Sequence, residues 1–152
     1  MAASTHYVRP SWTERQLVNR IARLLVGRLG RSADEIHLLA VTGRSSRQIR
    51  LTPVKVLPLD GRRYLVSRRG ESDWARNLRA APEAELRLGS RREPVRAVPV
   101  AGEEAAHALR EYVRQASLKN TATLLGVGSA DAPEADFLLS AEDHPVFRLA
   151  PR

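Results

Sequence analysis

Residues 48–69 have the sequence QIRLTPVKVLPLDGRRYLVSRR, and this stretch predicts a β-hairpin. Asp60-Gly61 is a strong turn signal, because both residues tolerate the positive φ that a two-residue hairpin turn requires. Strands are expected on either side of the turn, at 48–57 and 62–69. Pro53 has no backbone N–H, so the first strand should lie at an edge or contain a bulge.

Apolar patterns outside the hairpin extend the same architecture along the chain. Further strands are expected at 36–42, 84–88, 93–100 and 145–149. Helical spacing of apolar residues predicts helices at 70–81, at 103–116 and, after a capping box at 11–14, up to Gly30. Residues 117–136 carry no regular pattern, and a loop of that length is often functional.

The expected fold therefore has about six mostly antiparallel strands with an N-terminal, a middle and a late helix. Successive hairpins argue against a doubly wound parallel sheet and favour a small barrel decorated by helices, of the α+β or mainly β class. The 152 residues fit one domain, because no linker or repeat divides them. Within it, residues 1–30 form a tail and an amphipathic helix, and residues 36–150 form the barrel.

The helix expected before Gly30 has a basic face opposite its leucines. Such a helix packs on the body of a domain, or it contacts a membrane surface or a partner. No apolar run reaches the ~18–20 residues of a membrane span, and residues 1–10 lack the apolar core of a secretory signal. The interpretation is a cytoplasmic protein, with peripheral membrane contact through this helix as an open alternative.

The composition excludes several kinds of catalytic site. Without any cysteine, the chain has no disulfide, zinc–thiolate site, iron–sulfur cluster or thiol nucleophile. None of the four histidines is paired at metal-ligand spacing, so no metal is expected. The signatures of P-loop enzymes and of α/β-hydrolases are missing as well.

Positive charge is concentrated in the middle of the chain. The net charge is +8, and residues 44–96 hold 13 of the 23 arginines and one lysine against six acidic residues. A field of this kind suggests an anionic partner, such as nucleic acid, anionic lipid or a phosphorylated coenzyme. Nucleic acid is disfavoured, because only 5% of the residues are aromatic and they are not interleaved with the basic cluster.

Three segments of this basic region together suggest an anion site. They are Thr42-Gly43-Arg44-Ser45-Ser46-Arg47 with Arg50 and Pro53, then Ser67-Arg68-Arg69-Gly70, and finally the helix start Ser72-Asp73-Trp74 with Arg76 and Asn77. Backbone amides, hydroxyls and guanidinium groups bind phosphate oxygens, and a helix N-terminus favours an anion. An ordinary hairpin beside a capped helix is the alternative interpretation.

Two spaced patterns within these segments are Thr42-Gly43-Arg44-x-Ser46-x-x-x-Arg50-x-x-Pro53 and Gly70-x-x-x-Trp74-x-x-Asn77-Leu78-x-Ala80-x-Pro82. They resemble T-G-R-K-S-G-x-x-R-x-x-P and G-x-x-x-W-x-x-N-L-x-A-x-P of the deazaflavin-dependent nitroreductase and quinone reductase family. Those enzymes are split β-barrels (FMN-binding-like) that use the 8-hydroxy-5-deazaflavin coenzyme F-420. The resemblance runs from about residue 36 to residue 150.

This resemblance implies an oxidoreductase that transfers hydride from reduced F-420 to a quinone, a nitro compound or an activated enone. The coenzyme's polyanionic tail would lie against Arg44, Ser45, Ser46, Arg47 and Arg50, and Pro53 is also assigned to the coenzyme site. Ser67, Arg68, Arg69 and Gly70 would hold the deazaflavin ring, largely through backbone. Trp74 and Asn77 would frame the helix beside the phosphate. Tyr112 and the 117–136 loop are candidates for the substrate side, with the core as the alternative place for Tyr112.

Two positions depart from the family's pattern, because Ser45 replaces its usual lysine and Arg47 replaces its second glycine. Arg47 either restores the lost charge or crowds a turn that prefers glycine. The main alternative function is a non-catalytic split barrel that binds a flavin such as FMN, a haem or a lipid. A basic nucleic-acid or membrane-surface module is a further alternative, and a homodimer is an open expectation.

Overall fold

The hairpin predicted around Asp60-Gly61 is present. In the computed structural model, which describes residues 36–116 and 120–152, φ is +51° at Asp60 and +72° at Gly61. Leu59, the last residue of strand β2 (Ile49–Leu59), faces Arg62, the first residue of strand β3 (Arg62–Val66). The predictions for residues 1–30 fall outside the described residues, and the single-domain assignment that includes them stays a prediction.

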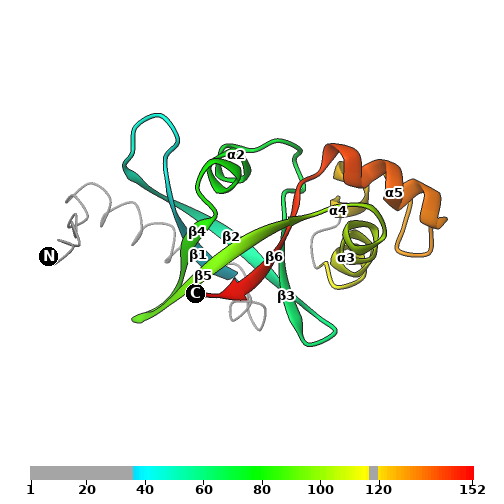
Figure 1. The fold of residues 1–152 in the computed structure, drawn as a ribbon. Coiled ribbons are helices and arrows are strands. Elements are labelled where there is room, and N and C mark those ends of the chain that lie inside the picture. Colours follow the sequence, from blue (N-terminus) through cyan, green and yellow to red (C-terminus); the bar gives the residue numbers. More distant parts are fainter. Residues whose placement is uncertain (1–35, 117–119) are drawn as a thin grey trace, which may run out of the picture. The chain divides into compact units, whose positions relative to one another are not determined.

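Six antiparallel strands close into a barrel in the order β1-β2-β3-β6-β5-β4 (Figure 1). The other strands are β1 (Ile36–Thr42), β4 (Glu83–Leu88), β5 (Arg91–Val100) and β6 (Val146–Pro151). The helices of the described part are α2 (Asp73–Ala80), α3 (Gly102–Arg114), α4 (Thr121–Leu124) and α5 (Glu134–Asp143). This arrangement confirms the expected antiparallel barrel. Within the described ranges, no helix combines the length and apolar character needed to cross a membrane.

Pro53 lies in the middle of β2 without a bulge. Residues 49–55 pair with β1 in an unbroken register, whereas β3 pairs only with Val56–Leu59. Over its first half, β2 therefore has one edge without a strand partner among the described residues. A residue that lacks an N–H is tolerated beside such an edge. Pro53 therefore pairs with Leu38 without the predicted bulge, and β2 as a whole is not the predicted edge strand, because it lies between β1 and β3 in the closed barrel.

The strands carry two apolar clusters, one on each face, and this explains the continuous buried run in β3. Leu65 belongs to the cluster inside the barrel, which also contains Phe147 and is closed by Leu78 of α2. Tyr64 and Val66 belong to a second cluster, which α3 and α5 share with the barrel wall. Successive strand side chains point to opposite faces, and here both faces are covered. Figure 1 shows α2 beside the β1–β2 connection, and α3, α4 and α5 grouped together away from it.

The prediction that residues 117–136 form an irregular loop is wrong in part, because α4 and the start of α5 lie there. Helix α5 buries only Phe137 and Ser140, while Leu138 and Leu139 are exposed. Its apolar residues therefore do not mark one buried face, and the helical period is hidden. Pro133 and the acidic first turn that follows it were the usable signals of a helix start.

Two predicted element boundaries also shift, because residues 67–72 form a loop of their own. The strand expected at 62–69 ends at Val66, and the helix expected at 70–81 begins at Asp73. In this loop, Gly70 N donates to Ser67 O and Ser72 N donates to Gly70 O. The loop therefore occupies the residues that were predicted as the end of the strand and the start of the helix.

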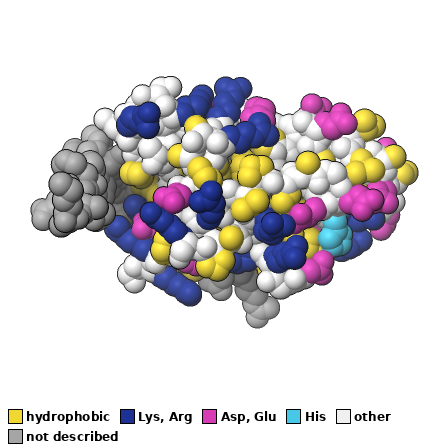
Figure 2. Space-filling model, viewed as in Figure 1, with side chains coloured by type: hydrophobic (Ala, Val, Ile, Leu, Met, Phe, Trp, Pro, Cys, Tyr) yellow, Lys and Arg dark blue, Asp and Glu magenta, His cyan; other side chains and the backbone are white. Residues whose placement is uncertain are grey.

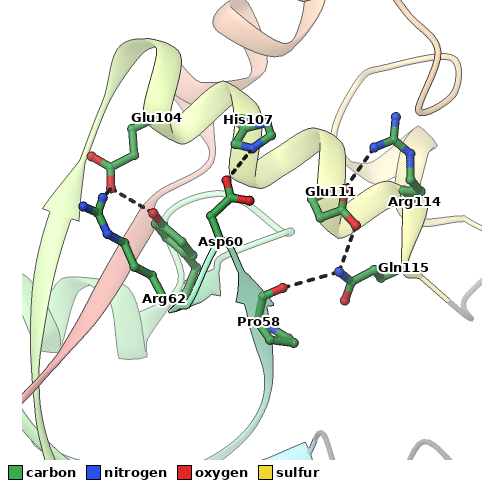
Figure 3. A network of polar contacts seen from close by, with 9 residues as sticks. Pro58, Asp60, Arg62, Glu104, His107, Glu111, Arg114 and Gln115 are labelled. Carbon is green, nitrogen blue, oxygen red and sulfur yellow. Dashed lines mark hydrogen bonds and ion pairs between the residues drawn. The ribbon is translucent and has the colours of Figure 1, made fainter.

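Helix α3 is fixed to the β2–β3 hairpin by polar side chains (Figure 3). His107 Nε2 lies 3.1 Å from Asp60 Oδ2 at the turn, and Gln115 Nε2 donates to Pro58 O over 3.4 Å. At the other end, Glu104 Oε1 accepts hydrogen bonds from Tyr64 at 3.0 Å and Arg148 at 2.7 Å. These contacts position the helix that carries Tyr112.

Two acidic residues that accept hydrogen bonds from arginines, Glu93 of β5 and Glu104 of α3, predict a loss of stability in acid. A hydrogen bond from Arg63 holds the pKa of Glu93 below its ordinary value of 4.5. Burial alone would raise the pKa of Glu104, but hydrogen bonds from Arg148 and Tyr64 bring it below 4.5 as well. Since both folded-state pKa values lie below the unfolded value, their stabilising effect is present above pH 4.5 and is lost as pH falls through the folded pKa.

We therefore expect the melting temperature to be level above about pH 5 and to fall towards pH 3. Each contribution should be below about 1 kcal/mol, because both carboxylates are partly exposed and solvent screens them. Thermal melts of Glu93→Gln and Glu104→Gln check this, since each variant should show a smaller acid-dependent decrease than the wild type. Identical pH profiles in all three proteins would contradict the assignment.

Candidate functional site

The connection between β1 and β2 is a tight turn that displays four exposed side chains, those of Arg44, Ser45, Ser46 and Arg47. Gly43 N donates to Gln48 O over 2.7 Å, and Arg47 N donates to Gly43 O over 2.9 Å. A Cβ atom on Gly43 would lie 2.6 Å from Ser46 Oγ and 3.2 Å from Gln48 O, so another residue would displace the Ser46 hydroxyl, and the turn favours glycine at this position. The same Cβ would lie 3.6 Å from Arg50 Cγ, which places Arg50 against the turn.

Arg47 adopts the left-handed backbone conformation, with φ at +59°. This conformation costs a residue with a Cβ about 1–2 kcal/mol, whereas glycine adopts it freely. The second glycine of the resembling pattern therefore corresponds to a position that favours glycine here too. Arg47 brings a positive charge to the turn and strains its backbone at the same time.

Replacing Arg47 with glycine should change stability and anion binding in opposite directions. We expect the free energy of unfolding to rise by about 0.5–1 kcal/mol, because the relief of strain exceeds the entropy that glycine gains in the unfolded chain. Affinity for a polyanion should fall severalfold, because a cation is lost. Urea unfolding measures the first effect, and Arg47→Gln is the control, since it removes the charge and keeps the strain. Equal stability of the two variants would show that the turn is not strained.

Arg44 joins this turn to helix α2. Its backbone N–H and its Nη1 both donate to Asn77 Oδ1, at 3.1 and 2.9 Å. Nη1 also donates to Asp73 O at 3.4 Å, and Nη2 lies 3.1 Å from Asp73 Oδ1. Asn77 is buried, with only 5% of its surface exposed. One buried amide oxygen thus connects two motifs that lie 33 residues apart.

The Ser67–Gly70 segment is a hydrogen-bonded loop in front of α2. Ser67 is buried, and its Oγ donates to Gly70 O at 2.5 Å and lies 2.8 Å from Ser72 Oγ. Its backbone N–H donates to Pro145 O, which ties the loop to the residue before β6. Gly70 has φ at +85°, a conformation that favours glycine. Ser72 makes no side-chain hydrogen bond to the first amides of α2, which lie beside this loop.

Uncompensated positive charge surrounds these segments. Figure 2 shows Lys and Arg side chains gathered over α2 and the β1–β2 turn. Four arginines in and beside the motifs are exposed and have no acidic partner among the described residues: Arg47, Arg50, Arg69 and Arg76. Arg68 is half-buried. Since no ion pair has to be broken, an anionic ligand can bind these four side chains at low cost.

The two aromatic residues of the predicted site lie in different apolar clusters. Trp74 packs against the inner cluster, and its ring centroid lies 6.0 Å from that of Phe147. It therefore anchors α2 to the barrel. Tyr112 is 7% exposed and belongs to the second cluster, with Lys55 Nζ 5.6 Å from its ring centroid. Burial raises the pKa of the Tyr112 phenol, and the charge of Arg68 partly offsets this increase.

The structure brings most of the predicted site residues into one neighbourhood, around the β1–β2 turn, the 67–72 loop and α2. Tyr112 is a core residue, and its role towards a substrate stays a prediction. Sequence reasoning missed Asp73 as a partner of Arg44, although an acidic residue in the first turn of α2 was a visible signal. Among the described residues, no three His, Asp or Glu side chains are placed to hold a metal ion.

Comparison with known proteins identifies the family. The family model for F-420H(2)-dependent quinone reductases matches residues 10–124, which include all three motif segments. This chain belongs to that family. It is therefore an oxidoreductase, and the family's name gives its reductant as reduced F-420. No curated protein matches the sequence.

Two solved structures share the fold. An F-420-H2-dependent reductase, FDR-A, is 23% identical with a TM-score of 0.51, and the match covers 76% of this chain and 94% of that chain. A domain-swapped dimer is 22% identical with a TM-score of 0.51, and that match covers 90% of this chain and 96% of the other. The split-barrel fold expected from the sequence is thereby confirmed.

Proposed function

We propose that the protein binds F-420 on the β1–β2 turn, the 67–72 loop and α2, and that it reduces a small electrophile, with a quinone as the first candidate. The observation that carries this proposal is the contact of Arg44 with buried Asn77, beside arginines that have no acidic partner in the part of the chain that the structure describes. This contact joins the family's two sequence patterns at one place in the structure.

The residues of the site suit the two chemically different parts of the coenzyme. The tail of F-420 is a phosphodiester followed by glutamates, and Arg47 and Arg50 offer it exposed guanidinium groups. Ser45 and Ser46 add exposed hydroxyls on the same turn. Residues 67–70 would hold the ring through backbone groups, because the Ser67 hydroxyl is already bonded within the loop.

The protein's part in the chemistry is binding, orientation and shielding. When bound, the reduced coenzyme supplies the hydride. The buried hydrogen bonds of Ser67 and Asn77 keep the loop and the helix in fixed positions on the barrel, so that a bound ring would be held in one orientation. This division of work explains why the chain needs no catalytic pair of side chains.

The proposal also covers the substrate, the oligomeric state and the alternative cofactor. The substrate is a small molecule that accepts hydride, such as a quinone, a nitro compound or an activated enone, and Tyr112 with the segment after α3 contributes to its side of the site. We also expect a cytoplasmic protein that forms a homodimer. FMN is the alternative cofactor, because its phosphate would meet the same arginines.

Titration with oxidised F-420, followed by tryptophan fluorescence, tests the proposal, because Trp74 lies on the helix of the site. Half of the protein should be bound at or below about 50 μM coenzyme, which corresponds to about 6 kcal/mol or more of binding free energy. Mixing with reduced F-420 and a short-chain quinone should then give coenzyme oxidation that depends on the protein. FMN and haem serve as parallel ligands, and tight binding of either without F-420 binding would favour the non-catalytic alternative.

A further inference from the structure

Asp73 places a negative charge directly on the arginine that anchors the candidate site. Its Oδ1 lies 3.1 Å from Arg44 Nη2, and its side chain is 84% exposed, against 36% for Arg44. No other contact of the Asp73 carboxylate is present among the described residues. The carboxylate is thus held by Arg44 and by little else.

The hydrogen bonds of Arg44 show what this contact removes from the site. A guanidinium group has five N–H donors. Two of them, on Nη1, point to Asn77 Oδ1 and Asp73 O, and one, on Nη2, points to Asp73 Oδ1. Two donors remain for a ligand while Asp73 is bound. A third becomes available if the Asp73 carboxylate turns towards solvent, which its exposure permits.

Asn77 and Asp73 therefore differ in their relation to a ligand. Asn77 is buried, neutral and bonded to the backbone of Arg44 as well as to its side chain, so it stays in place when an anion arrives. Asp73 is exposed and carries the same charge as the coenzyme's tail. An anion that approaches Arg44 is repelled by Asp73 or has to displace it.

We propose that Asp73 is an affinity-determining residue, whose carboxylate competes with the anionic tail of the coenzyme for Arg44. This inference rests on the proposed function, since it concerns the same site. In the absence of coenzyme, the positive charge of Arg44 is partly neutralised by the carboxylate of Asp73. Coenzyme binding then exchanges one anion on Arg44 for another, and this exchange lowers the net gain in affinity.

The test compares Asp73→Asn with Glu83→Gln. Glu83 is an exposed acidic residue at the start of β4, outside the three motif segments, and its Oε2 lies 3.0 Å from Arg152 Nη2. Both variants remove one negative charge, so they change the general field of the protein equally. Asp73→Asn should tighten binding of oxidised F-420 about two- to fivefold at low salt, the range expected for an exposed ion pair. Glu83→Gln should change it less than about 1.5-fold.

Two further measurements separate the outcomes. The effect of Asp73→Asn should shrink in about 0.5 M salt, where exposed charges are screened, and it should vanish in an Arg44→Gln background. Equal effects of Asp73→Asn and Glu83→Gln, or an effect that survives the loss of Arg44, would overturn the competition. A wild-type protein that fails to bind F-420 overturns the proposed function itself. Binding without a specific effect of Asp73 overturns only this inference.

Discussion

Replacing Asn77 with leucine will lower the free energy of unfolding by about 2–3 kcal/mol and weaken coenzyme binding about tenfold or more. The amide oxygen of Asn77 accepts the backbone N–H and the Nη1 of Arg44, and leucine offers neither bond an acceptor. The cost is large because Asn77 is buried, so the partly buried N–H of Arg44 is left without a replacement. The β1–β2 turn also loses its attachment to α2.

Urea unfolding and F-420 titration of the same variant measure the two effects together. Asn77→Asp is the matched control, because it keeps an oxygen acceptor of the same size at the same place. We expect its stability to stay within about 1 kcal/mol of the wild type. Leucine and aspartate variants of equal stability would show that the contact with Arg44 does not hold the turn. Loss of binding in the leucine variant at unchanged stability would make Asn77 a direct ligand instead of a positioning residue.

The part of the fold that could be predicted from the sequence is the part fixed by local chemistry. Asp60-Gly61 determines a turn because its two residues tolerate positive φ, and the structure has positive φ at both. The alternation of Ala84 and Leu86 with charged residues likewise reports a strand with one buried face. These signals depend only on neighbours in the chain, so no tertiary contact can hide them.

Elements stabilised mainly by tertiary contacts were not predictable in the same way. In helix α5, Leu139 is 64% exposed, whereas Ser140 is buried. The Oγ of Ser140 donates to Leu125 O, and Leu125 belongs to the second cluster. Its pattern is therefore misleading until α3 is placed beside it. Residues 67–72 leave the helical pattern because Ser67 and Ser72 bond to each other, and spacing alone does not reveal such a bond.

In the candidate site too, the residue types were predictable from the sequence, whereas their tertiary contacts were not. The sequence patterns contain Arg44 and Asn77, but their spacing does not indicate that the two side chains touch. The strain at Arg47 was visible only as a departure from a glycine in the pattern, and the φ of +59° gives that departure a physical meaning. Asp73 was hidden because an acidic first turn is explained equally well by the helix dipole.

The charge on the β1–β2 turn gives the second large prediction. The double variant Arg47→Gln/Arg50→Gln will weaken F-420 binding about 20- to 50-fold at low salt. It removes two exposed guanidinium groups that have no acidic partner within residues 36–116 and 120–152. Stability should hardly change, since glutamine at position 47 keeps the strained conformation and both side chains are exposed. The decrease should be much smaller in about 0.5 M salt, where the contribution of these charges is already screened.

Arg91→Gln/Arg92→Gln is the control that distinguishes a local site from a general positive field. These two arginines are also exposed and lie at the start of β5, outside the three motif segments, and their removal changes the net charge by the same amount. A local site predicts a decrease in affinity of no more than about threefold for this variant. If both double variants weaken binding equally, the coenzyme is attracted by the net charge of the protein, and the β1–β2 turn is not where its tail binds. If only the first variant does, the arginines of the turn bind the tail, and the affinity has a local cause.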